Sequence, residues 1–192
     1  MMNTPILFCL IPDFIYYDGT EAPNIPECMN FLPIEIGEGA DRAELLFGAL
    51  TQKQTLPLSA LGTESDGYVG GVTVVFCTKA ENGALVTVGW YENANVTETP
   101  NILPCENEDG GAHDHPFFFC CRRENAVLLP YEDRFAPIWA IPRNKSGKKG
   151  KFGFSSDRVW LCDEGEAASW RDGFLSQLQT YNGDNVLNDS EA

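Results

Sequence analysis

Two runs of apolar residues in the middle of the chain give the clearest structural pattern. Val72–Cys77 and Leu85–Tyr91 are rich in β-branched and aromatic side chains, which favour extended backbone. Glu81-Asn82-Gly83 lies between them and has the composition of a tight turn. The sequence therefore predicts a β-hairpin over residues 72–91.

Other short apolar runs predict further strands, and prolines and glycines predict the connections. The connection from Pro12 to Pro33 is rich in proline and is expected to lack regular structure. Thr99–His115 contains Pro100, Pro104 and an acidic glycine-ended run, so it is expected to form a long solvated loop. The additional predicted strands are Ile6–Leu10, Phe117–Arg122, Ala126–Leu129, Ile138–Ile141 and Arg158–Cys162.

Two segments have the spacing of helices. Asp41 followed by Glu44 matches a capping box, and the leucines after it predict a short helix. The same spacing recurs at Asp163 and Glu166. Beyond it, aromatic and apolar residues recur at helical intervals up to Asn182-Gly183, which is a stop signal. These recurring residues are Trp170, Phe174, Leu178 and Tyr181.

Strands in the middle with helices beside them predict an α+β fold. We expect a strongly bent antiparallel or mixed β-sheet, or a small barrel, with flanking helices that include a C-terminal helix. Residues 1–183 are expected to form one domain and residues 184–192 a disordered tail. No alternation of β and α units, GxGxxG motif or GxxxxGK[ST] motif is present, which argues against a doubly wound nucleotide-binding fold.

Composition places the chain among ordinary globular proteins. It has 192 residues, of which 43% are hydrophobic. The apolar stretch near the start is broken by prolines and lacks a basic leader, so we expect neither a signal peptide nor a membrane span. Seven cysteines without framework spacing are expected to be reduced core thiols, which favours a cytoplasmic location.

The net charge of -15 is unevenly distributed. Residues 122–158 contain nine of the thirteen lysines and arginines against four acids, whereas residues 1–121 contain three basic and seventeen acidic residues. An acidic body opposes non-specific binding of nucleic acid, but a local basic loop can still bind phosphate. The glycine-rich stretch from Arg143 to Ser156 is such a loop, and we expect it to be exposed and mobile.

The only two histidines suggest one alternative chemistry, a metal site. His113 and His115 would share one face of a strand, and Cys105 with Cys120 would complete four zinc ligands. No CxxC pair anchors this set, and Pro116 interrupts the strand pattern, so an acidic exposed loop is the preferred interpretation. A Cys–His nucleophile pair has no family-specific signature either.

The basic loop and nearby aromatic residues predict a ligand site. Aromatic rings at strand ends would stack on a base, while ammonium groups and hydroxyls hold phosphate oxygens. The alternative is that the rings belong to the core and the loop is a solvated hairpin tip. The candidate ligand-binding residues are Trp90, Tyr91, Asn93, Arg143, Lys145, Lys148, Lys149, Lys151, Ser155 and Trp160.

The block Val88–Val96, with the sequence VGWYENANV, resembles the "VGWYKNATV" block of a prokaryotic domain found beside HNH-type nuclease modules. Glu92 replaces the basic residue usual in that block. Weaker blocks fit the order of the same domain. They are Ile6–Cys9 near the start and, after Val96, Asn125–Pro130, Pro142–Gly150, Phe154-Ser155 and Val159-Trp160. The resemblance implies a reader of modified DNA in restriction or another prokaryotic defence system.

We therefore expect a non-catalytic recognition domain that binds a nucleic acid or nucleotide, with no cofactor and no membrane partner. The first alternative is an acidic protein-interaction or inhibitor module, which could mimic nucleic acid and bind a nuclease or another basic protein. The second is a metal-dependent hydrolase that uses the two histidines.

Overall fold

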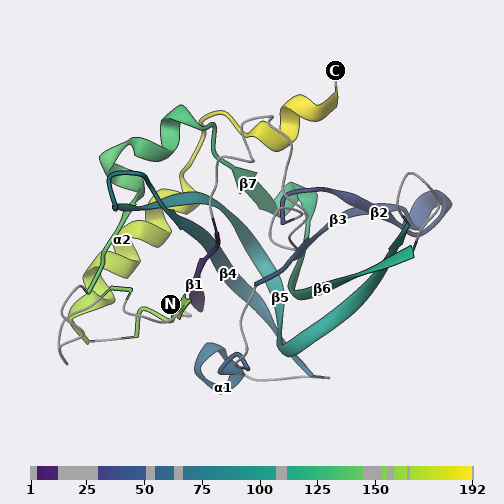
Figure 1. The fold of residues 1–192 in the computed structure, drawn as a ribbon, viewed down its shortest axis with the longest axis horizontal. Helices are drawn as coiled ribbons and strands as arrows, with labels where there is room; N and C mark the ends of the chain where they lie inside the picture. The colour runs from purple at the N-terminus through teal and green to yellow at the C-terminus, as the bar shows by residue number, and fades with distance from the viewer. Residues whose placement is uncertain are drawn as a thin grey trace.

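The computed structural model describes residues 4–12, 30–50, 55–62, 67–106, 112–144, 153–154, 158–163 and 165–191. Within these residues nine strands form one mixed sheet, in which the strands lie in the order β2-β3-β6-β5-β4-β1-β9. Strands β7 and β8 both pair with β5 beside this path. The sheet is strongly bent and does not close (Figure 1), which confirms the predicted α+β class and the bent-sheet alternative.

The predicted hairpin is confirmed and is longer than its sequence pattern indicated. Strand β4 spans Tyr68–Lys79 and β5 spans Leu85–Glu106, and the two pair antiparallel. Their register shifts at bulges, first between Val69 and Val72. A bulge adds an unpaired residue and increases the local twist, so these shifts account for part of the bend.

The first predicted strand is also confirmed, and it is the only parallel partner among the described strands. Strand β1, Ile6–Leu10, pairs parallel with β4. Its other edge pairs antiparallel with β9, Val159–Trp160. The carboxyl ends of β1 and β4 therefore lie at the same end of the sheet.

The predicted helix after Asp41 is wrong. A single 3-10 turn, η3 (Gly39–Asp41), leads instead into strand β3, Ala43–Gly48, which pairs with β6 and with β2, Ile34–Ile36. Capping-box spacing is a local signal, whereas sheet partners on both sides provide hydrogen bonds to this segment that an isolated short helix would not gain.

The long solvated loop predicted for Thr99–His115 is also wrong over most of its length. The first part continues β5 to Glu106, and the last part begins β6, Ala112–Arg122, so the two form a second hairpin. Within it Pro104 is opposite Asp114, and Pro116 is opposite Ile102. The predicted strand Phe117–Arg122 lies within β6 and is confirmed.

The chain after β6 alternates very short strands with 3-10 turns. Strand β7 covers Ala126–Leu128 and β8 only Ala140–Ile141, so the predicted strands there are present but shorter. The turns between them are η4 (Arg123–Asn125), η5 (Glu132–Phe135) and η6 (Pro137–Trp139). Turn η7, Gly165–Ala167, precedes the last helix.

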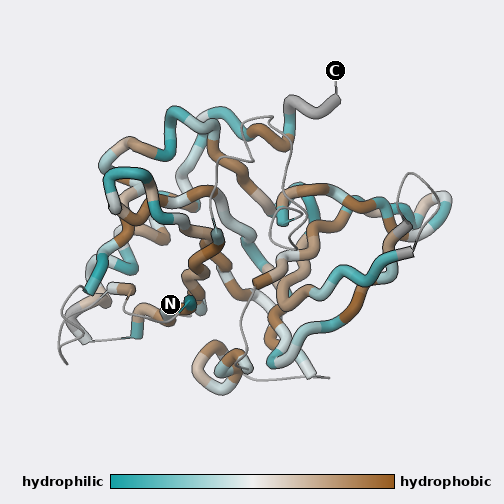
Figure 2. The backbone as a smooth tube through the Cα atoms, viewed as in Figure 1, coloured by the Kyte–Doolittle hydropathy of each residue, from teal (hydrophilic) through white to brown (hydrophobic). Residues whose placement is uncertain are grey.

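Side chains of β1 alternate between two hydrophobic clusters on opposite faces of the sheet. Leu7 and Cys9 belong to one cluster, whereas Ile6 and Phe8 belong to the other. Both faces are therefore covered, which explains why β1 and β4 are nearly continuous apolar runs. Figure 2 shows this concentration of hydrophobic residues along the central strands.

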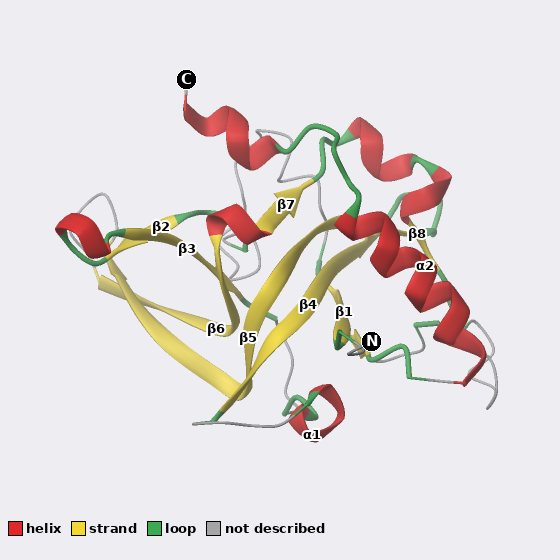
Figure 3. Ribbon diagram, turned by 180° about the vertical axis from the view of Figure 1, so that it is seen from behind, coloured by secondary structure: helices red, strands yellow, loops and turns green. Residues whose placement is uncertain are grey.

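The C-terminal helix α2, Ala168–Gln179, confirms the second predicted helix and covers one face of the sheet (Figure 3). Its buried residues Phe174, Leu175 and Leu178 join the cluster that contains Trp90 and Trp160. Helix α1, Leu58–Leu61, contributes to the cluster on the other face. Among the described residues, no helix combines the length and the apolar character needed to cross a membrane.

The tail expected to be disordered packs on the domain as far as Asn188 and forms turn η8, Val186–Glu191. The Asn185 side chain accepts a hydrogen bond from the Leu128 amide and donates one to the Ala126 carbonyl, both at 2.9 Å. Leu187 is buried against the core. The polar composition of residues 184–192 did not indicate this docking, because the docking depends on only two residues, Asn185 and Leu187.

Candidate functional site

The aromatic residues predicted to stack on a ligand lie in the core. Trp90 and Tyr91 are fully buried on β5. The Trp90 ring stacks on Trp139 at 5.5 Å between centroids, and its Nε1 donates to Glu92. The Tyr91 hydroxyl donates to the Asn30 carbonyl. Neither ring presents a face to solvent, so the core alternative accounts for both.

Trp160 occupies a similar position on β9. It is 7% exposed and packs against Phe8, Trp170 and Phe154, with centroid distances of 5.0, 5.5 and 5.8 Å. The ring therefore joins β9 to β1 and α2 within one aromatic cluster. The sequence pattern did not identify the side chains that cover it.

Asn93 lies at the bulge between β4 and β5 and has a φ of 52°. Its neighbour across the bulge, Gly71, has a φ of 73°. Asparagine and glycine tolerate this left-handed backbone better than other residues, which gives Asn93 a structural role. A pocket of about 240 Å³ opens here between Glu92, Asn93 and α2.

Most of the predicted phosphate-binding residues lie outside the described residues: Lys145, Lys148, Lys149, Lys151 and Ser155. The base of this segment is defined, however. The Asn144 amide donates to the Phe154 carbonyl at 2.8 Å, and the Phe154 amide donates to the Pro142 carbonyl at 3.0 Å. Phe154 is buried, so both ends of the lysine-rich stretch are anchored on the core.

Three exposed cations gather at the end of the sheet where β1 and β4 terminate. Arg143 Nη1 lies 3.5 Å from the carbonyl oxygen of Gly83, in the turn after β4. Lys79 is the last residue of β4, and its Cε lies 3.9 Å from the position that a Cβ on Gly83 would take. Arg158 Nη1 lies 3.5 Å from the carbonyl of Leu10, the last residue of β1.

We call Lys79, Arg143 and Arg158 the cation group. They differ from several other arginines of the protein in their distance from carboxylates. Within the described part of the chain, none of them has a carboxylate within salt-bridge distance. By contrast, Arg42, Arg122 and Arg123 lie against Glu35, Glu124 and Glu44. The cation group is therefore a positive surface that no described carboxylate neutralises, in a protein with a net charge of -15.

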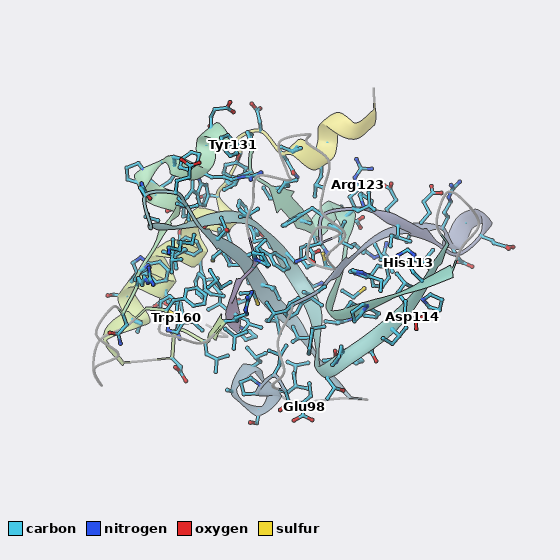
Figure 4. The ribbon with its side chains drawn as sticks, viewed as in Figure 1. Glu98, His113, Asp114, Arg123, Tyr131 and Trp160 are labelled. Atoms are coloured by element: carbon cyan, nitrogen blue, oxygen red, sulfur yellow. The ribbon has the colours of Figure 1, made fainter. Side chains whose placement is uncertain are left out.

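The histidines do not form the metal site considered above. His113 is directly opposite Cys105 in the β5–β6 register, and His115 is opposite Leu103. His115 is buried with Nε2 3.2 Å from the Phe47 carbonyl, while Cys120 pairs with Asn95 and Phe47. No three potential ligands converge among the described residues. Figure 4 shows that His113 and Asp114 lie far from Trp160, at the other side of the molecule.

The thiols lack the properties of an activated nucleophile. Cys9, Cys77, Cys121 and Cys162 are buried, and all six described cysteines are free. Burial raises the pKa of Cys9 and Cys77 well above the ordinary value. The pKa of Cys105, opposite His113, is also raised, by desolvation and by the nearby Asp114 carboxylate. A catalytic thiol needs a lowered pKa, so the Cys–His alternative has no support in the described residues.

Comparison of the chain with family models, with curated protein sequences and with solved structures finds no match. Lys79 is the residue that sequence reasoning missed. Its signal was present, because it is one of only three basic residues before position 122 and directly follows a strand, but its neighbours were not visible in the sequence.

Proposed function

We propose that the protein is a recognition module that binds the phosphate groups of a nucleic acid or nucleotide at the cation group. The observation that carries the proposal is the position of Lys79, Arg143 and Arg158 at one end of the sheet, all exposed and without carboxylate partners among the described residues. A guanidinium group presents paired N–H donors that match phosphate geometry.

The lysine-rich segment extends this charge along the chain. It begins directly after Arg143 and returns seven residues before Arg158, and Lys145, Lys148, Lys149 and Lys151 lie within it. Cations concentrated at one place on an acidic protein favour a ligand whose phosphates bind at that single site. The acidic remainder of the surface disfavours non-specific binding of duplex DNA. The resemblance of Val88–Val96 to a domain found beside nucleases supports a reader role in prokaryotic defence.

The test is the salt dependence of oligonucleotide binding by the Arg143→Ala/Arg158→Ala double variant. Each lost phosphate contact should reduce the slope of log K against log salt by about 0.7 for a single strand and 0.9 for a duplex. The matched control is Arg42→Ala/Arg122→Ala, which removes the same charge from two exposed arginines that face carboxylates. Equal slopes for the two variants would contradict the proposal.

A second candidate function, an acidic module that binds a basic protein, is supported by the opposite edge of the sheet. The β2–β3 region exposes Glu35, Glu38 and Asp41, and Ile36 on edge strand β2 is 40% exposed. Acidic rims with an apolar residue steer basic partners. Recovery of a basic protein at low salt by the wild-type protein, lost in Glu35→Gln/Glu38→Gln, with no binding of oligonucleotides, would favour this function.

A further inference from the structure

A pocket of about 240 Å³ lies at the β4–β5 turn, whose Gly83 carbonyl is contacted by Arg143. It is lined by Ala80, Glu81 and Asn82 from the β4–β5 turn and by Tyr131 and Phe135. The turn is held by hydrogen bonds from the Ala80 amide to Ala84 and from the Gly83 amide to Ala80, both at 2.8 Å. The pocket and two members of the cation group, Lys79 and Arg143, therefore lie at the same hydrogen-bonded turn.

Two aromatic rings form one wall of this pocket. The centroids of Tyr131 and Phe135 are 5.3 Å apart in an edge arrangement. Phe135 remains 45% exposed, unlike the aromatic residues of the core. An exposed aromatic face is the usual platform for a planar heterocycle.

Arg134 fixes this wall from behind. It is fully buried, and both its Nε and its Nη2 donate to the Leu129 carbonyl, at 3.0 and 2.8 Å. Its guanidinium lies 5.9 Å from the centroid of the Tyr131 ring. Turn η5 is thus held to Leu129, the residue that directly follows β7. Figure 4 shows Tyr131 near the top of the molecule in that view. A wall held in place loses little entropy when a ligand binds.

The polar residues of the pocket define what the ligand must present. Asn82 Oδ1 accepts a hydrogen bond from the Ala84 amide at 2.9 Å, which orients the side-chain amide, and the NH₂ group of this amide is a donor. Glu81 is exposed and supplies a carboxylate acceptor. Donor and acceptor beside an aromatic wall match the edge of a nucleobase that carries an amino group.

The volume of the pocket is suited to a base and is too small for a whole nucleotide. Clefts that enclose drug-sized ligands have volumes of roughly 300–1,000 Å³, so a pocket of about 240 Å³ takes a ring system and leaves the phosphate outside. The Glu81 carboxylate repels phosphate from the pocket, while Lys79 and Arg143, near Gly83 of the same turn, attract it. The pocket and the cation group would together orient a ligand that carries both a base and a phosphate.

We propose that this pocket binds a nucleobase with an exocyclic amino group, whose phosphate lies on the cation group. The inference rests on the proposed function, because the cations supply the phosphate contact. It goes beyond that function by assigning the base-binding residues to Tyr131, Phe135, Glu81 and Asn82 in place of the buried tryptophans.

The experiment is calorimetric titration at low salt with GMP, IMP, CMP, UMP and inorganic pyrophosphate. GMP and IMP differ only in an exocyclic amino group, so wild-type protein should bind GMP more tightly than IMP, and CMP more tightly than UMP. Phe135→Ala should weaken nucleotide binding about 5- to 150-fold, the range of one lost base stack, and leave pyrophosphate binding unchanged. Glu81→Gln should remove the preference for the amino-bearing base.

The control is Ile138→Ala, which truncates another exposed apolar residue, 57% exposed, that does not line the pocket. Equal affinity for nucleotides and pyrophosphate, or unchanged nucleotide binding in Phe135→Ala and Glu81→Gln, would overturn the base pocket while the phosphate site stands. Absence of pyrophosphate binding together with base discrimination would overturn the cation group instead. Glu81→Gln changes an exposed turn residue, so it tests the pocket even if Phe135→Ala fails to fold.

Discussion

Arg143 and Gly83 lie sixty positions apart in the sequence, yet Arg143 Nη1 is 3.5 Å from the Gly83 carbonyl oxygen. This contact places Arg143, which directly precedes the lysine-rich segment, on the turn between β4 and β5. At 3.5 Å the hydrogen bond is weak, so the guanidinium retains donors for a ligand. The same turn lines the aromatic pocket, and one structural element therefore joins the two proposed parts of the site.

The role of Lys79 is tested by Lys79→Ala. We expect weaker binding of a single-stranded oligonucleotide and a salt slope smaller by about 0.7, because one phosphate contact is lost. The measurement is a fluorescence titration at several salt concentrations. Arg42→Ala is the control, since it removes one exposed positive charge at the β2–β3 edge. A slope reduced equally by both changes would mean that only net charge matters.

Gly89→Ala should destabilise the fold by about 1–3 kcal/mol, the usual cost of overpacking. A Cβ at this position would lie 2.3 Å from the Val127 carbonyl oxygen and 2.8 Å from Phe31 Cζ. The β5–β7 contact leaves no room for it. Urea unfolding followed by tryptophan fluorescence measures the change.

Gly173→Ala is the matched control for this substitution. Gly173 lies inside α2, and no atom lies within 4 Å of the position its Cβ would take. Alanine should therefore stabilise the helix, by about 0.5–1 kcal/mol. Similar destabilisation by both alanines would contradict the packing described for β5.

Asn185→Ala should release the C-terminal segment and cost about 1–3 kcal/mol, because the Leu128 amide and the Ala126 carbonyl each lose a partly buried partner. Hydrogen exchange at the Leu128 amide should become faster. Asn188→Ala, an exposed change in the same segment, should leave both the exchange and the stability near wild type. Unchanged protection in Asn185→Ala would show that the tail does not depend on this side chain.

Stability should decrease as the pH rises above about 9, measured in the presence of a reducing agent. Burial raises the pKa of Cys9 and Cys77 in the folded protein above the ordinary value of 9.0, so the unfolded state loses these protons first. The stabilisation is complete below pH 9.0 and is lost as the pH increases, by up to about 1.4 kcal/mol per pH unit for each thiol. Urea midpoints at pH 7 to 10 measure this effect.

Cys77→Ala provides the control for the pH dependence, because it removes one of the buried thiols. Its alkaline slope should be smaller than that of the wild-type protein, whatever the cost of the substitution at pH 7. A wild-type stability that stays constant up to pH 10 would contradict the assignment of these groups as buried protonated thiols.

Local sequence determined the elements whose partners are close in the chain. The β4–β5 hairpin follows from two β-branched runs around Glu81-Asn82-Gly83, and α2 follows from the spacing of Trp170, Phe174 and Leu178. The uneven distribution of charge is also a property of the sequence itself. These features need only short-range geometry, since turns and amphipathic periods are encoded within a few residues.

Tertiary structure alone decided the features that depend on distant partners. Ala43–Gly48 is a strand because β6 and β2 pair with it, and Trp90 is covered because α2 and η6 close over the sheet. Arg143 lies near Lys79 because β8 pairs with β5, and Arg158 lies at the same end of the sheet because β9 pairs with β1 and β1 with β4. The pocket of Tyr131 and Phe135 depends on the docking of η5. Burial and proximity across the chain arise from packing, which no local pattern records.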